Sequence, residues 1–236
     1  MRLEKASHKA IVYACKMFHY AKSVPVNVTG YSVFNDDNKW CGVVLFGSGA
    51  NNNLAANFSL SQGQAAELVR VALNGNHGST SKALSLALKL IKKDLPLCKI
   101  IISYADCDQN HFGTIYQATN WFYTGTQMEN QHDSSWLIKG KRYHGRIVSD
   151  FVKSKGGLKG LTREQFLKKY YDNNAKPYIT KGKIKYIYPL DKSLIPMCKK
   201  LSKPYPKKCD VSRTANAADF QSAEGGQHDH IAQLSK

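Results

Sequence analysis

A group of polar residues between positions 103 and 121 has the types and spacing needed for chemistry. Asp106 follows the apolar run over residues 100–104, whose short length and β-branched residues are typical of a buried strand. Open α/β sheets bind ligands beyond the carboxyl ends of their strands, so a carboxylate at this position is a site candidate. His111, Tyr116 and Asn120 follow closely and can gather around the same opening.

A purely structural interpretation of this group stays open. An aspartate at a strand end is often a cap or a turn former. Buried tyrosine and tryptophan side chains are usually core residues whose polar atom has found a partner. The pattern alone therefore does not separate a catalytic group from a well-packed one.

The charge of the chain is large and unevenly distributed. The 236 residues include 34 Lys plus Arg against 17 Asp plus Glu, a net charge of +17. Between residues 139 and 208 there are 20 basic residues and 4 acidic ones, so a net charge of +16 lies in that stretch. Such a surplus attracts phosphate backbones through counterion release, which makes nucleic acid the favoured partner. A membrane partner is not expected because no long amphipathic basic helix is visible, whereas a solvated basic face remains an alternative.

We therefore expect three segments. Residues 1–138 form a near-neutral catalytic core, residues 139–208 a basic part that packs on the core and binds DNA, and residues 209–236 a disordered tail. The six cysteines show no CxxC pair and no metal-ligand spacing, which is typical of reduced thiols. No signal peptide and no apolar run near 18 residues is visible, so a cytoplasmic location is expected.

Hydrophobic periodicity predicts the elements that must position these residues. Helices are expected over residues 8–22, 79–93 and 111–121, and after the capping box that begins at Thr162; strands are expected over 28–34, 40–46, 67–73, 100–104, 122–126 and 183–190, and a hairpin over 136–144. Glu67 and Arg70 are three positions apart and should face opposite sides of their strand. In the last strand tyrosines alternate with lysines, which suits a nucleic-acid surface as well as an ordinary buried strand.

In this order the elements resemble the GNAT-type acyltransferase fold, an α+β fold with a mixed, mostly antiparallel central sheet flanked by helices. Here a basic C-terminal extension would be added. The motifs are narrower and resemble the Mom family of bacteriophage DNA-modifying enzymes from about residue 15 to residue 200. They are His19-Tyr20 with Ser23-Val24-Pro25, Glu67-Leu68-Val69-Arg70, Ser103-Tyr104-Ala105-Asp106 with His111 and Gly113, Tyr116-Gln117-Ala118, Asn120-Trp121, and the string from Lys141 to Arg146.

The resemblance implies an enzyme that converts adenine in double-stranded DNA to N6-carbamoylmethyladenine and so protects phage DNA from host restriction. It also implies that Arg70, Asp106 and Tyr116 are catalytic, and that His19 and Tyr20 join Asp106 in binding iron. The expected acyl-CoA phosphate turn is poor in glycine at residues 75–81, so acyl-CoA is a doubtful donor and the group donor is not identified.

Further roles follow from the expected reaction. The adenine must leave the stack by base flipping, because its N6 is paired in the duplex. Asn120 or Gln117 is expected to read its edge, and Trp121 or Tyr104 to stack on it. The residues expected to contact DNA phosphates are Lys139, Lys141, Arg142, Arg146, Lys183 and Lys185.

Two other functions remain open from the sequence. An acyl-CoA-dependent GNAT enzyme could acetylate a protein or a small molecule. A non-enzymatic DNA-binding protein would need only the basic half. Neither alternative accounts for the ordered polar motifs around Asp106.

Overall fold

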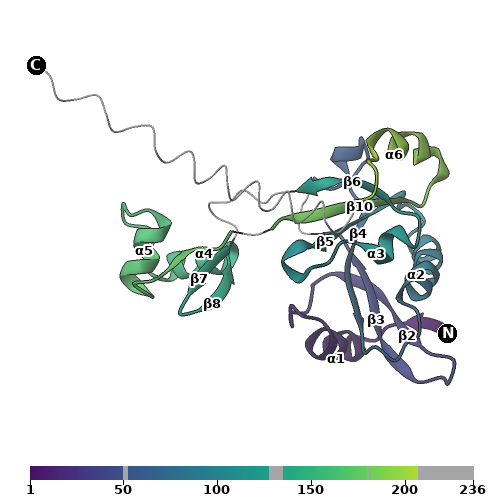
Figure 1. Cartoon of the computed structure of the whole chain (residues 1–236), viewed down its shortest axis with the longest axis horizontal. Coiled ribbons are helices and arrows are strands. Elements are labelled where there is room, and N and C mark those ends of the chain that lie inside the picture. Colours follow the sequence, from purple (N-terminus) through teal and green to yellow (C-terminus); the bar gives the residue numbers. More distant parts are fainter. Residues whose placement is uncertain (50–52, 128–134, 180, 207–236) are drawn as a thin grey trace, which may run out of the picture. The chain divides into compact units, whose positions relative to one another are not determined.

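The computed structural model of the chain describes residues 1–49, 53–127, 135–179 and 181–206. These residues form two compact units (Figure 1). Among the described residues, the first unit comprises 1–105, 113–125 and 184–205, and the second comprises 106–112, 126–183 and 206. The expected tail over 209–236 lies outside the described residues.

The first unit is built on a seven-stranded sheet with the order β1-β2-β3-β4-β5-β10-β6. Its strands are β1 Arg2–Lys5, β2 Val28–Phe34, β3 Trp40–Gly47, β4 Ala65–Leu73, β5 Ile100–Asp106, β6 Phe122–Gln127 and β10 Lys183–Pro189. Strands β1 to β4 pair antiparallel with their neighbours, whereas β4 and β5 pair parallel. This mixed, mostly antiparallel sheet confirms the expected α+β class.

Helices flank this sheet. They are α1 His8–Phe18, α2 Thr80–Asp94, α3 Thr114–Gln117 and α6 Ile195–Leu201, with 3-10 turns η1 Ala56–Phe58 and η3 Lys192–Leu194. Helix α1 buries Ile11, Ala14 and Cys15 against Val43 and Leu45 of β3. Because these helix residues recur at a spacing of three to four, a single apolar face covers the sheet.

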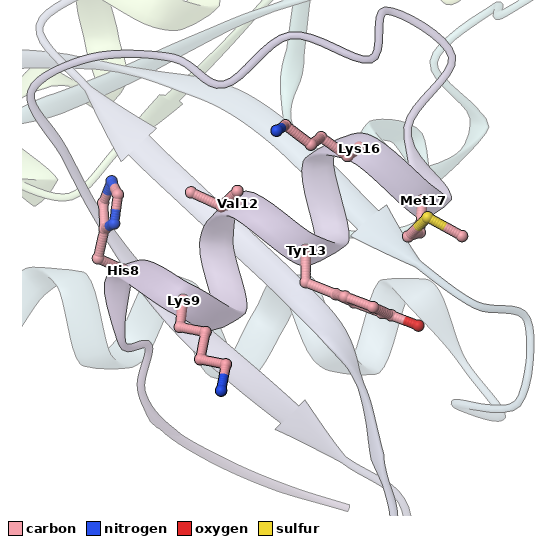
Figure 2. Close-up of a pocket in the computed structure, with 6 residues that line it drawn as sticks. All are labelled: His8, Lys9, Val12, Tyr13, Lys16 and Met17. Carbon is pink, nitrogen blue, oxygen red and sulfur yellow. The ribbon is translucent and has the colours of Figure 1, made fainter.

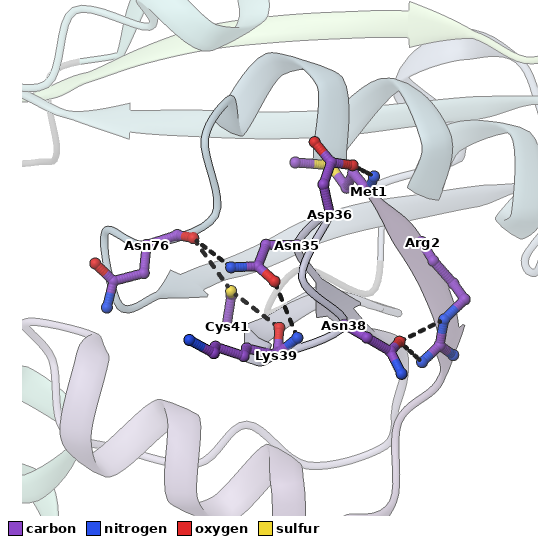
Figure 3. A network of polar contacts seen from close by, with 8 residues as sticks. All are labelled: Met1, Arg2, Asn35, Asp36, Asn38, Lys39, Cys41 and Asn76. Atoms are coloured by element: carbon purple, nitrogen blue, oxygen red, sulfur yellow. Dashed lines mark hydrogen bonds and ion pairs between the residues drawn. The ribbon is translucent and has the colours of Figure 1, made fainter.

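The turn between β2 and β3 is joined to two other segments by polar contacts (Figure 3). The Asn35 side chain accepts a hydrogen bond from Lys39 N (2.9 Å) and donates one to the Asn76 carbonyl (3.3 Å). Asp36 forms an ion pair with the N-terminal ammonium group. These contacts hold the β2–β3 turn against the start of β1 and against the turn that precedes α2.

The second unit contains a small antiparallel sheet with the order β8-β7-β9 and two helices. The elements are β7 Ser135–Ile138, β8 Lys141–His144, β9 Lys176–Pro177, α4 Gly145–Ser154 and α5 Arg163–Tyr170, with the 3-10 turn η2 Cys107–Gln109. Its core is apolar and contains Trp136, Ile138, Val148, Phe166, Leu167 and Ala175. The capping box of Thr162 and Gln165 is confirmed at the start of α5.

Several expected elements have different limits in the structure. The helix expected over 111–121 is only the four-residue α3, because Gly113 (φ 78°) and Asn120 (φ 61°) adopt left-handed backbone conformations that interrupt it. Helix α1 ends at Phe18 because His19 is extended. Strands β1 and β9 and helices α4 and α6 were not predicted from the sequence.

The two units do not follow the boundary expected at residue 139. Strand β10 inserts between β5 and β6, and α6 follows it, so the basic segment 184–205 belongs to the first unit. The first unit therefore has 17 basic and 6 acidic residues, a net charge of +11, and is not near neutral. Residues 135–183 of the second unit have 13 basic and 3 acidic residues, a net charge of +10 over a much shorter stretch.

The five described cysteines are buried and form no disulfide among the described residues. A helix able to span a bilayer is not found in the described part of the chain.

Candidate functional site

A β-bulge in β4 sets the positions of two charged residues. In the register of β3 and β4, Leu45 lies opposite Arg70 and Phe46 lies opposite Leu68, so Val69 is an extra residue. Gly47 lies opposite Glu67. Because paired residues share a face and side chains alternate along β3, Glu67 and Arg70 lie on the same face of the sheet. The prediction that they face opposite sides was wrong, since an unbroken strand was assumed.

Strands β4 and β5 diverge close to this bulge. Their parallel ladder joins only Ala65–Glu67 to Ile100–Ile102, although both strands continue further. Ser103 Oγ donates a hydrogen bond to the Leu68 carbonyl (3.0 Å) just beyond the last ladder pair. The backbone of β4 past this point is not paired with β5 in the described ladder, so the pairing of the two strands opens here.

Two tyrosines border this opening. Tyr104 shares the face of Glu67, because it follows Ile102 by two residues and Ile102 pairs with Glu67. Ser103 points to the other face, where its Oγ lies 2.9 Å from the Tyr116 hydroxyl. Burial raises the pKa of both phenols, and the negative charge of Glu67 raises each pKa further, although the Ser103 hydrogen bond opposes this at Tyr116. Both phenols are therefore protonated at neutral pH and can donate hydrogen bonds.

The other aromatic residues near Tyr116 form a packed core. The Tyr116 ring lies 5.1 Å from the Trp121 ring and 5.0 Å from the Tyr186 ring, measured between centroids. Trp121 and Tyr186 are fully buried, and the Gln117 amide donates a hydrogen bond to the Tyr186 hydroxyl (3.0 Å). In this structure Trp121 therefore presents no open face to a base. Of the two tyrosines of β10, Tyr186 is buried in the core and Tyr188 is half-buried. Asn120 is exposed at the end of the α3 segment.

Arg70 is a half-buried cation on β4. Its Nη1 donates to the Val69 carbonyl (2.8 Å) and its Nη2 to Ser23 Oγ (3.3 Å), while Nε is buried without a hydrogen-bond partner among the described atoms. A partly buried guanidinium with spare donors is suited to binding an anion. Ser23 follows His19 and Tyr20 closely, so the Arg70 contact ties the segment after α1 to β4.

His19 and Tyr20 lie together at the end of α1. Their rings are 4.3 Å apart between centroids, and Tyr20 is 46% exposed. His19 Nδ1 accepts a hydrogen bond from Ala21 N (3.1 Å), so a metal ion would have to use Nε2.

In the second unit, Asp106 begins the turn η2. Its Oδ1 accepts a hydrogen bond from Asp108 N (3.0 Å), and its carbonyl accepts one from His111 N (3.1 Å). His111 is exposed. Asp106 is therefore the N-cap of η2, as the structural interpretation of the sequence expected.

The residues expected to contact phosphate differ in their surroundings. Lys139, Lys141 and Arg146 are exposed in the second unit, where Lys139 forms the β7–β8 turn with a φ of 50°. Arg142 instead forms an ion pair with Asp108 (2.8 Å). The second unit also contains Lys183, which is half-buried, whereas Lys185 is in the first unit with its Nζ 5.1 Å from the Phe58 ring. Burial lowers the pKa of Lys185.

A shallow groove on the outward side of α1 is separate from these residues. It is lined by His8, Lys9, Val12, Tyr13, Lys16 and Met17 (Figure 2). None of the predicted site residues lines it, so the groove is not the predicted site.

Comparison with known proteins decides the family. The model of the Mom protein family matches residues 1–207. The chain belongs to the Mom family. The match confirms the resemblance found in the motifs, and it supports a transferase that acts in phage DNA modification. No curated protein matches the chain.

Solved acetyltransferases are similar to the Mom-family chain in fold only. A point mutant of the spermidine N-acetyltransferase SpeG from Vibrio cholerae is 11% identical, with a TM-score of 0.45 over 83% of this chain and 97% of that one. A Bacillus subtilis acetyltransferase in complex with CoA is 13% identical, with a TM-score of 0.41 over 80% of this chain and 98% of that one. At TM-scores below 0.5 the similarity does not extend to substrate or mechanism.

The iron site implied by the family resemblance is not assembled within one unit. His19 and Tyr20 belong to the first unit and Asp106 to the second. The described residues contain no group of three His, Cys, Asp or Glu side chains that could hold a metal ion. Imidazole, phenolate and carboxylate would suit iron chemically, but this structure does not show them as one ligand set.

Glu67 is a site candidate that the sequence analysis did not select. Its carboxylate lies where β4 and β5 diverge, and its negative charge raises the pKa of Tyr104 and of Tyr116. The loop after β3 passes close to it, since a Cβ added to Gly49 would lie 2.5 Å from Glu67 Oε2. A carboxylate at a strand opening could have been suspected from sequence, but its face depends on the bulge at Val69.

Proposed function

We propose that this chain converts adenine in double-stranded DNA to N6-carbamoylmethyladenine, protecting phage DNA from restriction in the cytoplasm of the host cell. The family match supports DNA modification. The structural observation that carries the proposal is the opening between β4 and β5, where the bulge brings Glu67 and Arg70 to the same face as Tyr104. A base, an anion-binding group and a hydrogen-bond donor are thereby available at one place.

The reaction makes demands that these residues meet. Adenine N6 is a weak nucleophile because its lone pair is delocalised into the ring. For a bond to form between N6 and the donor methylene carbon, one N6 proton must pass to a base and the leaving group must depart with its bonding electrons. Glu67 in the first unit and Asp106 in the second unit are each a carboxylate that could accept this proton. Arg70 would bind an anionic part of the donor. A protonated phenol, Tyr104 on the Glu67 face or Tyr116 on the Ser103 face, would donate to charge that develops during transfer.

Other residues are candidates for binding the DNA backbone and recognising the target base. The target base must be extruded from the duplex before N6 can react. The exposed cations Lys139, Lys141 and Arg146 of the second unit are suited to phosphates, which position DNA without reading its sequence. Asn120 is exposed and remains our candidate for reading the adenine edge.

Restriction protection tests this function in cells. Plasmid DNA from bacteria that express the chain should resist restriction enzymes whose sites contain adenine, and plasmid from cells with Arg70→Met protein should be cut. Complete cutting of both plasmids, with binding of acetyl-CoA by the purified chain, would instead favour an acyl-CoA-dependent enzyme. Complete cutting without such binding would favour a DNA-binding protein.

The state of the Tyr116 phenol gives a pH prediction. Burial and Glu67 both favour the neutral phenol, so its pKa lies above the ordinary value of ~10. The hydrogen-bond donor is consequently present throughout the neutral range and is lost only as the pH rises through this raised pKa. Ultraviolet titration of wild type minus Tyr116→Phe should show the missing tyrosinate signal only above a pH of ~10. A signal that develops near neutral pH would contradict the assignment of Tyr116 as a donor.

A further inference from the structure

The surroundings of Arg142 differ from those of a side chain that binds phosphate. Its Nη1 lies 2.8 Å from Asp108 Oδ2, and its Nε donates to Ser135 Oγ (3.2 Å). The guanidinium also lies over the Tyr178 ring, 4.4 Å from the ring centroid. Three protein groups of the second unit thus fix one guanidinium from three directions.

Asp108 links this guanidinium to the turn that begins with Asp106. Its Oδ1 accepts a hydrogen bond from Lys181 N (2.9 Å), and its own N–H donates to Asp106 Oδ1 (3.0 Å). The neighbouring Cys107 N donates to the Gly182 carbonyl (3.2 Å). The Asp106 turn is therefore held by contacts to residues 181–182 and to β8.

Because the Asp108 carboxylate is buried, the turn depends on its ion pair with Arg142. The Asp108 side chain is only 4% exposed, whereas that of Arg142 is 37% exposed. Removing the partner of a buried carboxylate leaves a charge without compensation, which disfavours the buried arrangement. Lysine would not replace Arg142 fully. A planar guanidinium can stack on Tyr178 while its N–H donors reach Asp108 and Ser135, and a single ammonium group cannot do both.

We propose that Arg142 is a positioning residue that holds the Asp106 carboxylate in place through Asp108, and is not a phosphate contact. The guanidinium orders the Asp108 carboxylate, Asp108 orders the turn, and the Asp108 N–H orients Asp106. This inference rests on the proposed function, because the orientation of Asp106 matters only if the chain modifies DNA.

Two neighbouring variants of the full chain separate the two roles. Arg142→Gln should lower kcat for DNA modification by at least ~10-fold, because Asp106 is misplaced. Its DNA affinity, and the slope of log K against log salt, should stay within about twofold of the wild-type values. Lys141→Gln, on the same strand but exposed, should instead weaken DNA binding and reduce the slope of log K against log salt by about 1. An Arg142→Gln protein that loses DNA affinity and salt slope as Lys141→Gln does would overturn the inference.

Two further measurements do not depend on DNA binding. Hydrogen exchange at the Lys181 amide should accelerate in Arg142→Gln and not in Lys141→Gln, because Asp108 loses its order. The double variant Arg142→Gln with Asp108→Asn should lose less activity than the product of the two single losses, since it leaves no buried charge. Unchanged exchange, or losses that multiply, would count against the inference. A wild-type chain that does not modify DNA refutes the proposed function, whereas an active wild type with an unaltered Arg142→Gln rate refutes only this inference.

Discussion

Replacement of Tyr116 with phenylalanine is expected to lower the rate of DNA modification at least ~100-fold, the effect of removing a positioned proton donor. The ring would keep its packing against Trp121 and Tyr186, so only the contact with Ser103 is lost. The free energy of unfolding should fall by only about 1 kcal/mol, which is typical of one hydrogen bond. Nucleoside analysis of modified DNA and urea denaturation would measure the two quantities.

Tyr186→Phe is the matched control for this variant. Tyr186 is also buried, and removal of its hydroxyl breaks the hydrogen bond that the Gln117 amide donates to it. Its stability loss should be similar, but the rate of modification should remain close to that of wild type. Equal rate losses in the two variants would show that Tyr116 acts through core packing and not as a donor.

Replacement of Gly113 with alanine is expected to destabilise the first unit by about 3 kcal/mol. Gly113 has a φ of 78°, and an added Cβ would lie 2.2 Å from Tyr186 Cε2. The cost of the backbone strain and the cost of the clash add together. Helix α3 begins directly after Gly113 and carries Tyr116. The midpoint and slope of urea unfolding would measure the loss.

Gly75→Ala provides the control for backbone strain alone. Gly75 has a φ of 86°, but an added Cβ would meet nothing within 4 Å. Its expected cost is only about 1 kcal/mol, from the left-handed conformation. If both variants lost the same stability, the close approach of Tyr186 to Gly113 would not be present in solution.

The elements that local pattern determines were predicted well. Strand β2 matches its predicted limits, because the run over 28–34 contains β-branched residues and ends at a polar turn. Helix α2 begins within one residue of its predicted start, and α5 begins at its predicted capping box. Ser79 and Thr162 accept hydrogen bonds from the first turn of each helix. Capping and alternation act over a few residues, and the sequence displays them directly.

The site depended on interactions that local pattern does not display. The bulge at Val69 is set by the register with β3 and reverses the relation between Glu67 and Arg70. The partner of Arg142 is Asp108, which lies 34 residues away in the chain. Trp121 was expected to stack on a base, but whether an aromatic ring faces solvent or core depends on how α3, β6 and β10 pack.

Mass spectrometry of nucleosides tests the central claim most directly. Total DNA from bacteria that express the chain should contain a deoxyadenosine about 57 Da heavier than the normal nucleoside, on a base that must be flipped to react. The same analysis with the Asp106→Ala chain should show only normal deoxyadenosine. Unmodified deoxyadenosine in cells with abundant wild-type chain, or an adduct that persists with Asp106→Ala, would contradict the account.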